Sequence, residues 1–106
     1  MEMDLQEATK KSGTAPFQQS ELKNMLYQIL SATHHIHEKW ILHRDIKTSN
    51  ILVQKSGKIA LCDFGLARKY QIPMKAMTQM VVTLWYRPPE LLFGENIYGP
   101  AIDMWR

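Results

Sequence analysis

The chain has 106 residues, of which 45% are hydrophobic and 22% are charged, so it allows one domain at most and is not typical of a disordered protein. Its formal charge of +3 comes from scattered basic residues, and no run of 18 apolar residues occurs, so the sequence predicts neither nucleic-acid binding nor a membrane span. The single cysteine, Cys62, excludes an internal disulfide and fits a reducing compartment, nuclear or cytoplasmic.

The N-terminal third of the chain predicts one long helix. Residues 1–8 allow a helical turn, and residues 10–16 form a polar loop rich in turn-forming residues. Ser20 then stands where a helix N-cap is expected. Apolar residues recur at three- and four-residue steps and predict a helix over residues 21–38 whose apolar stripe packs in a core. The stripe consists of Leu22, Met25, Leu26, Ile29, Leu30 and Ile36.

Two short apolar runs, residues 51–53 and 59–62, predict a β-hairpin. The turn between them contains Ser56 and Gly57, which favour a tight reversal of the chain. Such a hairpin delivers Asp63 at the exit of its second strand.

The following residues, 64–98, show no clean periodicity, which is unusual in a compact domain and commonly functional. Four helix-breaking residues interrupt them: Pro73, Pro88, Pro89 and Gly94. Residues 100–106 then predict the beginning of another helix.

Three short motifs occur in order along the chain. The segment His43-Arg44-Asp45-Ile46-Lys47-Thr48-Ser49-Asn50 precedes the hairpin, Asp63-Phe64-Gly65 follows it, and Pro88-Pro89-Glu90 comes last. Each motif alone is weak, because a single aspartate in a loop is usually a cap or turn residue. Their order, and the hairpin between the first two, make the combination very specific.

Together these motifs resemble the protein kinases, and the resemblance covers nearly the whole chain. It implies an α+β fold: a fragment of the mainly helical C-terminal lobe of a kinase, with a small β-hairpin. Residues 1–106 would form a partial kinase domain from the hinge end to the start of a helix, with the N-lobe and later C-lobe helices absent. Because no glycine-rich loop or V-A-I-K lysine occurs in these residues, we expect the isolated fragment to be poorly stable and inactive.

The resemblance implies ATP and Mg²⁺ as cofactors and assigns roles to the motif residues. Asp45 would orient and deprotonate the attacking hydroxyl, and Lys47 would stabilise charge on the γ-phosphate. Asn50 and Asp63 would bind Mg²⁺ through oxygen atoms. Thr83 would help to hold Asp45 and Lys47 in line. Taken singly, Asn50 would more often be a cap and Lys47 a solvated charge.

The same resemblance places further nucleotide contacts on four residues outside the catalytic motif. Met1 aligns with the hinge strand beside adenine, Asp4 with a carboxylate near the ribose, and Leu52 with the floor under the base. Cys62 would line the back of the pocket, although a residue in this position is more often simply packed.

Thr78 falls at the activating phosphothreonine of the family, so an activating kinase is an expected partner. A phosphate there needs guanidinium groups, and the family pattern assigns this role to Arg44 and Arg68. The alternative is that Thr78 is an ordinary loop threonine.

Val81, Val82 and Arg87 resemble the pocket that selects proline directly after the target residue. Since proline lacks an N–H group, a site that offers that position no free carbonyl would favour it. This predicts protein substrates with Ser/Thr-Pro sequences.

Residues 63–68 and 81–87 resemble the cyclin-dependent kinases, and Lys47 marks serine/threonine rather than tyrosine kinases. Residues 47–50 resemble the PITSLRE-type and transcription-associated branches, and residues 73–78 resemble the PITSLRE-type branch. Pro88-Pro89-Glu90 replaces the usual Ala-Pro-Glu, as in the transcription-elongation branch. The sub-branch is therefore open, and a cyclin is an implied partner.

Two other interpretations remain. A truncated, non-catalytic isoform that competes for cyclin or substrate would carry the same motifs, and an unrelated small α+β binding domain would carry them by coincidence. For a kinase, we expect His43 to pack against Phe64 and Asp103 to reach the backbone of the catalytic loop. His35 and His37 of the long helix are two residues apart and lie on different faces, and the histidines are not expected to bind a metal.

Overall fold

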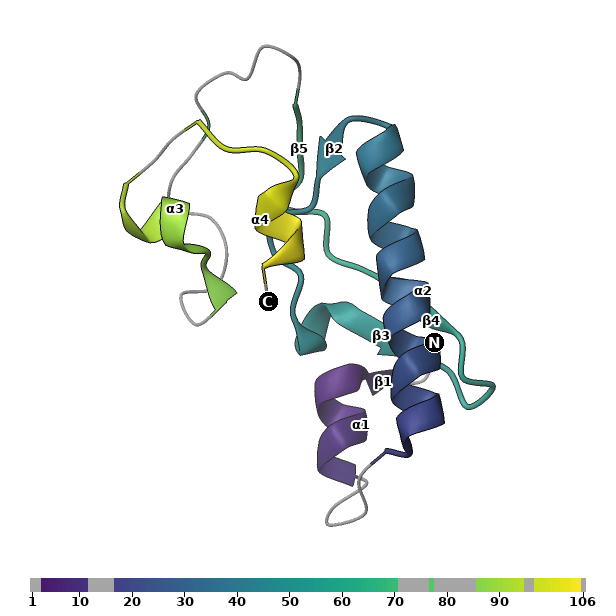
Figure 1. The fold of residues 1–106 in the computed structure, drawn as a ribbon. Helices are drawn as coiled ribbons and strands as arrows, with labels where there is room; N and C mark the ends of the chain where they lie inside the picture. Colours follow the sequence, from purple (N-terminus) through teal and green to yellow (C-terminus); the bar gives the residue numbers. More distant parts are fainter. Residues whose placement is uncertain (1–2, 12–16, 71–76, 78–85, 95–96, 106) are drawn as a thin grey trace.

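The computed structural model describes residues 3–11, 17–70, 77, 86–94 and 97–105 (Figure 1). The described residues form helices and small antiparallel sheets, in agreement with the predicted α+β fold. In order, the elements are β1 (Met3–Asp4), α1 (Leu5–Lys11), α2 (Gln19–Glu38), β2 (Ile41–Leu42), the 3₁₀ turn η1 (Thr48–Asn50), β3 (Ile51–Val53), β4 (Ile59–Leu61), β5 (Arg68–Lys69), α3 (Pro89–Leu92) and α4 (Ala101–Met104). Within the described part of the chain, no helix has the length and apolar character needed to cross a membrane.

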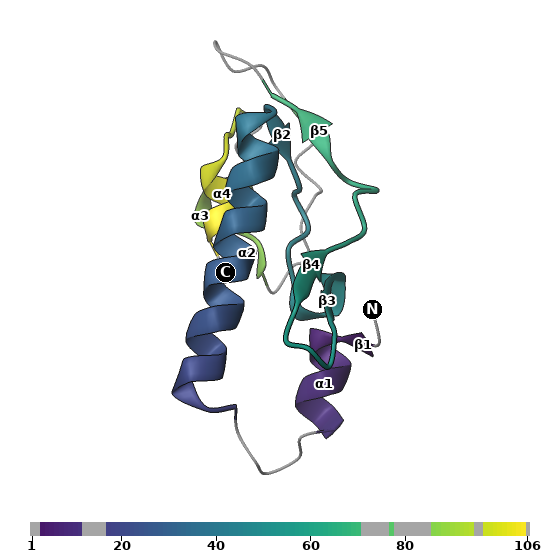
Figure 2. The ribbon, with the colours of Figure 1, turned by 90° about the vertical axis from the view of Figure 1, so that its right-hand side faces the viewer.

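The strands form two small antiparallel sheets. The predicted hairpin is confirmed as β3 and β4, and β1 joins it to give a three-stranded sheet with the order β1-β3-β4. The second sheet pairs β2 with β5, with Leu42 opposite Arg68. Figures 1 and 2 show the first sheet beside the N-terminal half of α2 and the second beside its C-terminal end. Neither the third strand β1 nor the β2–β5 pair was predicted.

The helix α2 begins differently from the prediction. It starts at Gln19, and Gln18 rather than Ser20 is the N-cap residue. The carboxylate of Glu21 accepts a hydrogen bond of 2.7 Å from the backbone N–H of Gln18. Because this capping box fixes the first turn, Ser20 lies inside the helix, and the N-cap prediction was wrong. The predicted end of the helix at Glu38 is confirmed.

The apolar stripe of α2 is only partly buried. Ile36 is buried, but Leu22, Leu26 and Leu30 are 51%, 56% and 42% exposed. The elements that pack most against α2 are β4 and β2, and two such short strands cannot cover a stripe of five turns. The periodicity therefore identified the helix correctly, whereas the predicted core packing was wrong for these three leucines.

The side chain of Gln28 forms two hydrogen bonds between α2 and the hairpin. Gln28 Oε1 accepts from the backbone N–H of Ile59, and its Nε2 donates to the carbonyl oxygen of Gly57, both at 2.9 Å. Gly57 has a φ of +87°, a backbone conformation that glycine adopts at little cost. The two hydrogen bonds of Gln28 thus hold the turn and the start of β4 against α2.

A cluster of buried apolar side chains lies beside the first motif. It brings together β2, α3 and α4 through Leu42, Leu91, Tyr98 and Ile102. Because Leu42 directly precedes His43, this core anchors the beginning of the loop that carries the first motif.

Candidate functional site

The first two motifs meet through the imidazole ring of His43. The backbone N–H of Asp45 donates to Nδ1 of this ring at 3.1 Å, and Nε2 donates to the carbonyl oxygen of Cys62 at 2.9 Å. Since Nδ1 is an acceptor, the proton of the ring lies on Nε2. The ring also packs against Phe64 at a centroid distance of 4.8 Å, as predicted. One buried imidazole therefore fixes the Asp45 loop against the exit of β4, where Asp63 stands.

The side chains of Asp45, Lys47 and Asn50 lie together. Asn50 Nδ2 donates to the backbone oxygen of Asp45 at 2.9 Å and to its carboxylate Oδ2 at 3.1 Å. Lys47 Nζ lies 3.7 Å from the same carboxylate oxygen. Asp45 and Asn50 are buried, with exposed fractions of 8% and 6%. The carboxylate of Asp45 is thus held in one orientation beside a cationic group.

Asp63 is exposed and has a strained backbone. Its φ of +58° lies in the left-handed region, which non-glycine residues adopt at a cost of about 1–3 kcal/mol. The backbone N–H of Gly65 donates to Asp63 Oδ1 at 3.2 Å, and a Cβ atom at position 65 would stand 3.1 Å from the same oxygen. Glycine at position 65 therefore leaves the Asp63 carboxylate unobstructed in this turn.

Three of the expected nucleotide contacts, Asp4, Leu52 and Cys62, belong to the β1-β3-β4 sheet or directly follow it. Asp4 of β1 is opposite Leu52 of β3 in the sheet. Burial raises the pKa of the Cys62 thiol, and the negative charges of Asp63 and Asp4 raise this pKa further. Asp4 also accepts a 2.7 Å hydrogen bond from the backbone N–H of Glu7 at the start of α1, a capping role that the sequence analysis missed. Met1 lies outside the described residues.

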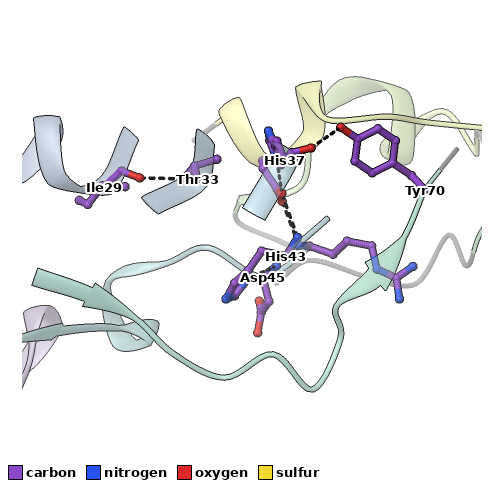
Figure 3. Close-up of polar contacts among 8 residues, drawn as sticks. Ile29, Thr33, His37, His43, Asp45 and Tyr70 are labelled. Atoms are coloured by element: carbon purple, nitrogen blue, oxygen red, sulfur yellow. Dashed lines mark hydrogen bonds and ion pairs between the residues drawn. The ribbon is translucent and has the colours of Figure 1, made fainter. Parts of the chain in front are cut away.

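Asp103 reaches the first motif, as predicted. Its two carboxylate oxygens accept hydrogen bonds of 2.9 Å from the backbone N–H groups of His43 and Arg44. The side chain is fully buried, and Oδ2 also lies 2.8 Å from Nε2 of His37. Figure 3 shows His37, near the end of α2, between the His43–Asp45 loop and Tyr70, whose hydroxyl donates to the carbonyl oxygen of His37 at 3.1 Å.

The sequence analysis missed the role of His37. The missing signal is spatial, because Asp103 lies 66 residues further along the chain. Nothing local in the sequence singles out His37 from His34, which is exposed and pairs with Glu38.

The two arginines that were assigned to a phosphate differ in their surroundings. Arg44 is 2% exposed; its Nε donates to the carbonyl oxygen of Leu66 at 2.6 Å, and its Nη1 donates to the hydroxyl of Tyr98 at 2.8 Å. Arg68 is exposed and donates to the neighbouring carbonyl of Ala67. Arg87 is half-buried. The other predicted residues of this region, Thr78, Val81, Val82 and Thr83, lie outside the described residues.

A cavity of about 280 Å³ lies between α2, the first motif and α4, and its lining includes Leu26, Ile46, Lys47 and Met104. Neither Asp63 nor Cys62 lines it. Of the residues expected to contact the nucleotide, Lys47 therefore lines this cavity, whereas Asp4, Leu52, Cys62 and Asp63 do not.

All 106 residues match the family of protein kinase domains. The chain therefore belongs to the protein kinase family, and its fold is kinase-like. It is 50% identical to a protein named cyclin-dependent kinase G-1 from Oryza sativa subsp. indica over 99% of the chain. It is 54% identical to cyclin-dependent kinase 11B from Mus musculus over 85% of the chain. The matches cover only 15% and 12% of these relatives. The predicted resemblance to cyclin-dependent kinases is confirmed.

We expect Asp103→Ala to destabilise the fold strongly. The substitution leaves the buried N–H groups of His43 and Arg44 without an acceptor, which should lower the free energy of unfolding by about 2–4 kcal/mol. Urea denaturation followed by circular dichroism measures this change. Glu38→Ala, which removes an exposed carboxylate, is the control and should change the free energy by less than about 0.5 kcal/mol. Equal effects of the two variants would contradict the role of Asp103.

We also expect Cys62 to react slowly with alkylating reagents. Because its pKa is raised, less of the reactive thiolate is present at neutral pH, and the rate should continue to rise with pH beyond the ordinary thiol range. Asp63→Asn removes a negative charge that opposes ionisation, so it should lower the pKa and speed alkylation at neutral pH. The measurement is the rate of iodoacetamide labelling against pH, with Glu38→Gln as the control. An unchanged rate in Asp63→Asn would show that this carboxylate does not influence the thiol.

Proposed function

We propose that the protein is a serine/threonine kinase of the cyclin-dependent type, which transfers the γ-phosphate of ATP to protein substrates. The observation that carries this proposal is that one side chain, His43, links the segments of two acidic residues, one buried and one exposed. The buried carboxylate of Asp45 and the exposed carboxylate of Asp63 belong to segments that the His43 ring ties together. Phosphoryl transfer requires this kind of fixed positioning more than it requires covalent help from the protein.

In this proposal, Asp45 orients the substrate hydroxyl and accepts its proton. The hydrogen bond from Asn50 keeps one carboxylate oxygen in place, so the geometry exists before substrate binds. Lys47, whose ammonium group lies close to the same carboxylate, stabilises negative charge on the transferring phosphate. Thr83 is assigned to the alignment of Asp45 and Lys47 on the family pattern alone.

The residues assigned to Mg²⁺ fit this ion. Mg²⁺ prefers oxygen ligands, and the exposed Asp63 offers a carboxylate. Asn50 uses its amide nitrogen for both bonds to Asp45, which leaves its amide oxygen as the atom suited to a cation. When bound, the ion would supply positive charge against the phosphates of ATP.

For the nucleotide, we assign adenine to Met1, the ribose to Asp4, the base floor to Leu52 and the back of the pocket to Cys62. The sheet supports a common site, because Asp4 is opposite Leu52 and Cys62 directly follows the strand that pairs with Leu52. We also assign these 106 residues mainly to the C-terminal lobe of the kinase domain.

Regulation and specificity follow the family pattern in this proposal. An activating kinase phosphorylates Thr78, and Arg44 and Arg68 bind the phosphate. A cyclin binds the kinase, which acts in the nucleus, the cytoplasm or both. Val81, Val82 and Arg87 select proline after the target residue.

The proposal predicts that Asp45→Asn abolishes most of the activity. In the protein at its natural length, we expect kcat to fall by about 10²–10⁴-fold, because the substituted amide cannot accept a proton. The measurement is transfer of radiolabelled phosphate from ATP to a Ser-Pro peptide in the presence of Mg²⁺. Glu38→Gln, remote from the motifs, should keep the wild-type rate. Undiminished transfer by Asp45→Asn would rule out the proposed role.

A matched peptide tests the substrate class. The same assay with Ser-Ala in place of Ser-Pro should give a much lower kcat/KM. Equal rates on both peptides would refute the proline pocket while leaving the kinase activity intact. Tyrosine phosphorylation in place of serine would refute the serine/threonine assignment.

A further inference from the structure

The side chain of Arg44 carries a positive charge that its described neighbours do not balance. It is 2% exposed, yet none of the ion pairs among the described residues includes it. Both oxygen atoms that accept its side-chain hydrogen bonds, the carbonyl of Leu66 and the hydroxyl of Tyr98, are neutral. An unbalanced charge in a buried place is costly, so this guanidinium is suited to receive an anion.

Tyr98 is well placed to control where that guanidinium points. Its ring is 4% exposed and belongs to the core cluster with Leu42, Leu91 and Ile102. Packing on several sides fixes the ring, so its hydroxyl oxygen is a rigid acceptor for Nη1 of Arg44 at 2.8 Å. A flexible arginine side chain otherwise loses considerable rotational freedom when it binds an anion.

The geometry points to Tyr98 as a positioning residue that holds Arg44 ready for the phosphate of an activating phosphothreonine. This inference rests on the proposed function, in which that phosphate is on Thr78, and it adds a residue that the motifs do not include. Tyr98 does not touch the phosphate or the substrate in this scheme. It acts through Arg44, by keeping Nη1 occupied and the plane of the guanidinium fixed.

The contact also explains why the phosphate signal would reach the catalytic loop. Arg44 precedes Asp45 directly, and its Nε donates to Leu66, which follows the Asp63-Phe64-Gly65 motif. The orientation of one guanidinium is therefore coupled to both segments that carry the acidic residues. Loss of the Tyr98 hydroxyl would loosen this coupling without opening a cavity, provided the ring is retained.

Tyr98→Phe tests the inference in the protein at its natural length. The measured quantity is the activation ratio, the activity after phosphorylation of Thr78 divided by the activity before it. We expect Tyr98→Phe to lower this ratio by about tenfold, as for loss of a hydrogen bond to a charged group. Tyr70→Phe removes a hydroxyl that binds the backbone of His37 instead, so this matched control should keep the wild-type ratio. Thermal unfolding of each variant identifies any loss of folded protein.

A double substitution separates positioning from a merely structural role. Arg44→Lys keeps the charge but lacks the planar group that Tyr98 orients. If Tyr98 acts through Arg44, Tyr98→Phe should lower the ratio no further in the Arg44→Lys background, whereas independent effects would multiply.

A wild-type ratio in Tyr98→Phe, or multiplicative effects in the double variant, would overturn the inference and leave the proposed function standing. A wild-type protein that transfers phosphate but ignores phosphorylation of Thr78 would overturn the assignment of Thr78 and this inference with it. A wild-type protein without any transfer would overturn the proposed function itself.

Discussion

The arrangement of the site depends on one buried carboxylate. Asp103 accepts hydrogen bonds from two consecutive backbone N–H groups, those of His43 and Arg44. Consecutive N–H groups in an extended chain point in opposite directions, so they can converge on one side chain only if the backbone turns sharply between them. The chain continues to turn at Arg44 itself, whose φ of +70° lies in the left-handed region. The position of α4 therefore sets the conformation of a loop about sixty residues earlier.

In this loop, three consecutive side chains point toward different parts of the structure. The ring of His43 reaches the exit of β4, the guanidinium of Arg44 reaches Tyr98, and the carboxylate of Asp45 faces Asn50. Left-handed conformations at Arg44 and at Asp63 each cost energy that surrounding contacts must offset. Trp40 also has a positive φ among the described residues, but Arg44 and Asp63 lie at the two acidic motifs, where a protein needs side chains held in fixed positions before its substrate arrives.

The sequence predicted the local elements better than their partners. Periodicity predicted the helix over 21–38, and Gly57 predicted the turn of the hairpin. Each of these signals is local, because it spans only a few neighbouring residues. The short strands β1, β2 and β5 carry too few residues to show a period, and their pairing joins distant segments, so they were not predicted. The exposure of Leu22 and Leu26 was also missed, since a stripe shows which residues share a face but not whether another element covers it. Among the site residues, the motif acids were found by their spacing. His37 and Tyr98 were not, because each acts through a partner more than fifty residues away.

The two acidic residues also differ in a way that suits a division of labour. Asp45 is buried and receives hydrogen bonds from Asn50, so its orientation is fixed at the cost of access to water. Asp63 is exposed, and among the described residues its carboxylate accepts a hydrogen bond from the N–H of Gly65 in its own turn. A hydrated cation binds most readily to a carboxylate that water can reach. A carboxylate that accepts the proton of a substrate hydroxyl must instead be held in a defined orientation. The spacing of the motifs identifies both acids but not their environments. The buried ring of His43 holds the two segments together, with Asp45 inside and Asp63 at the surface.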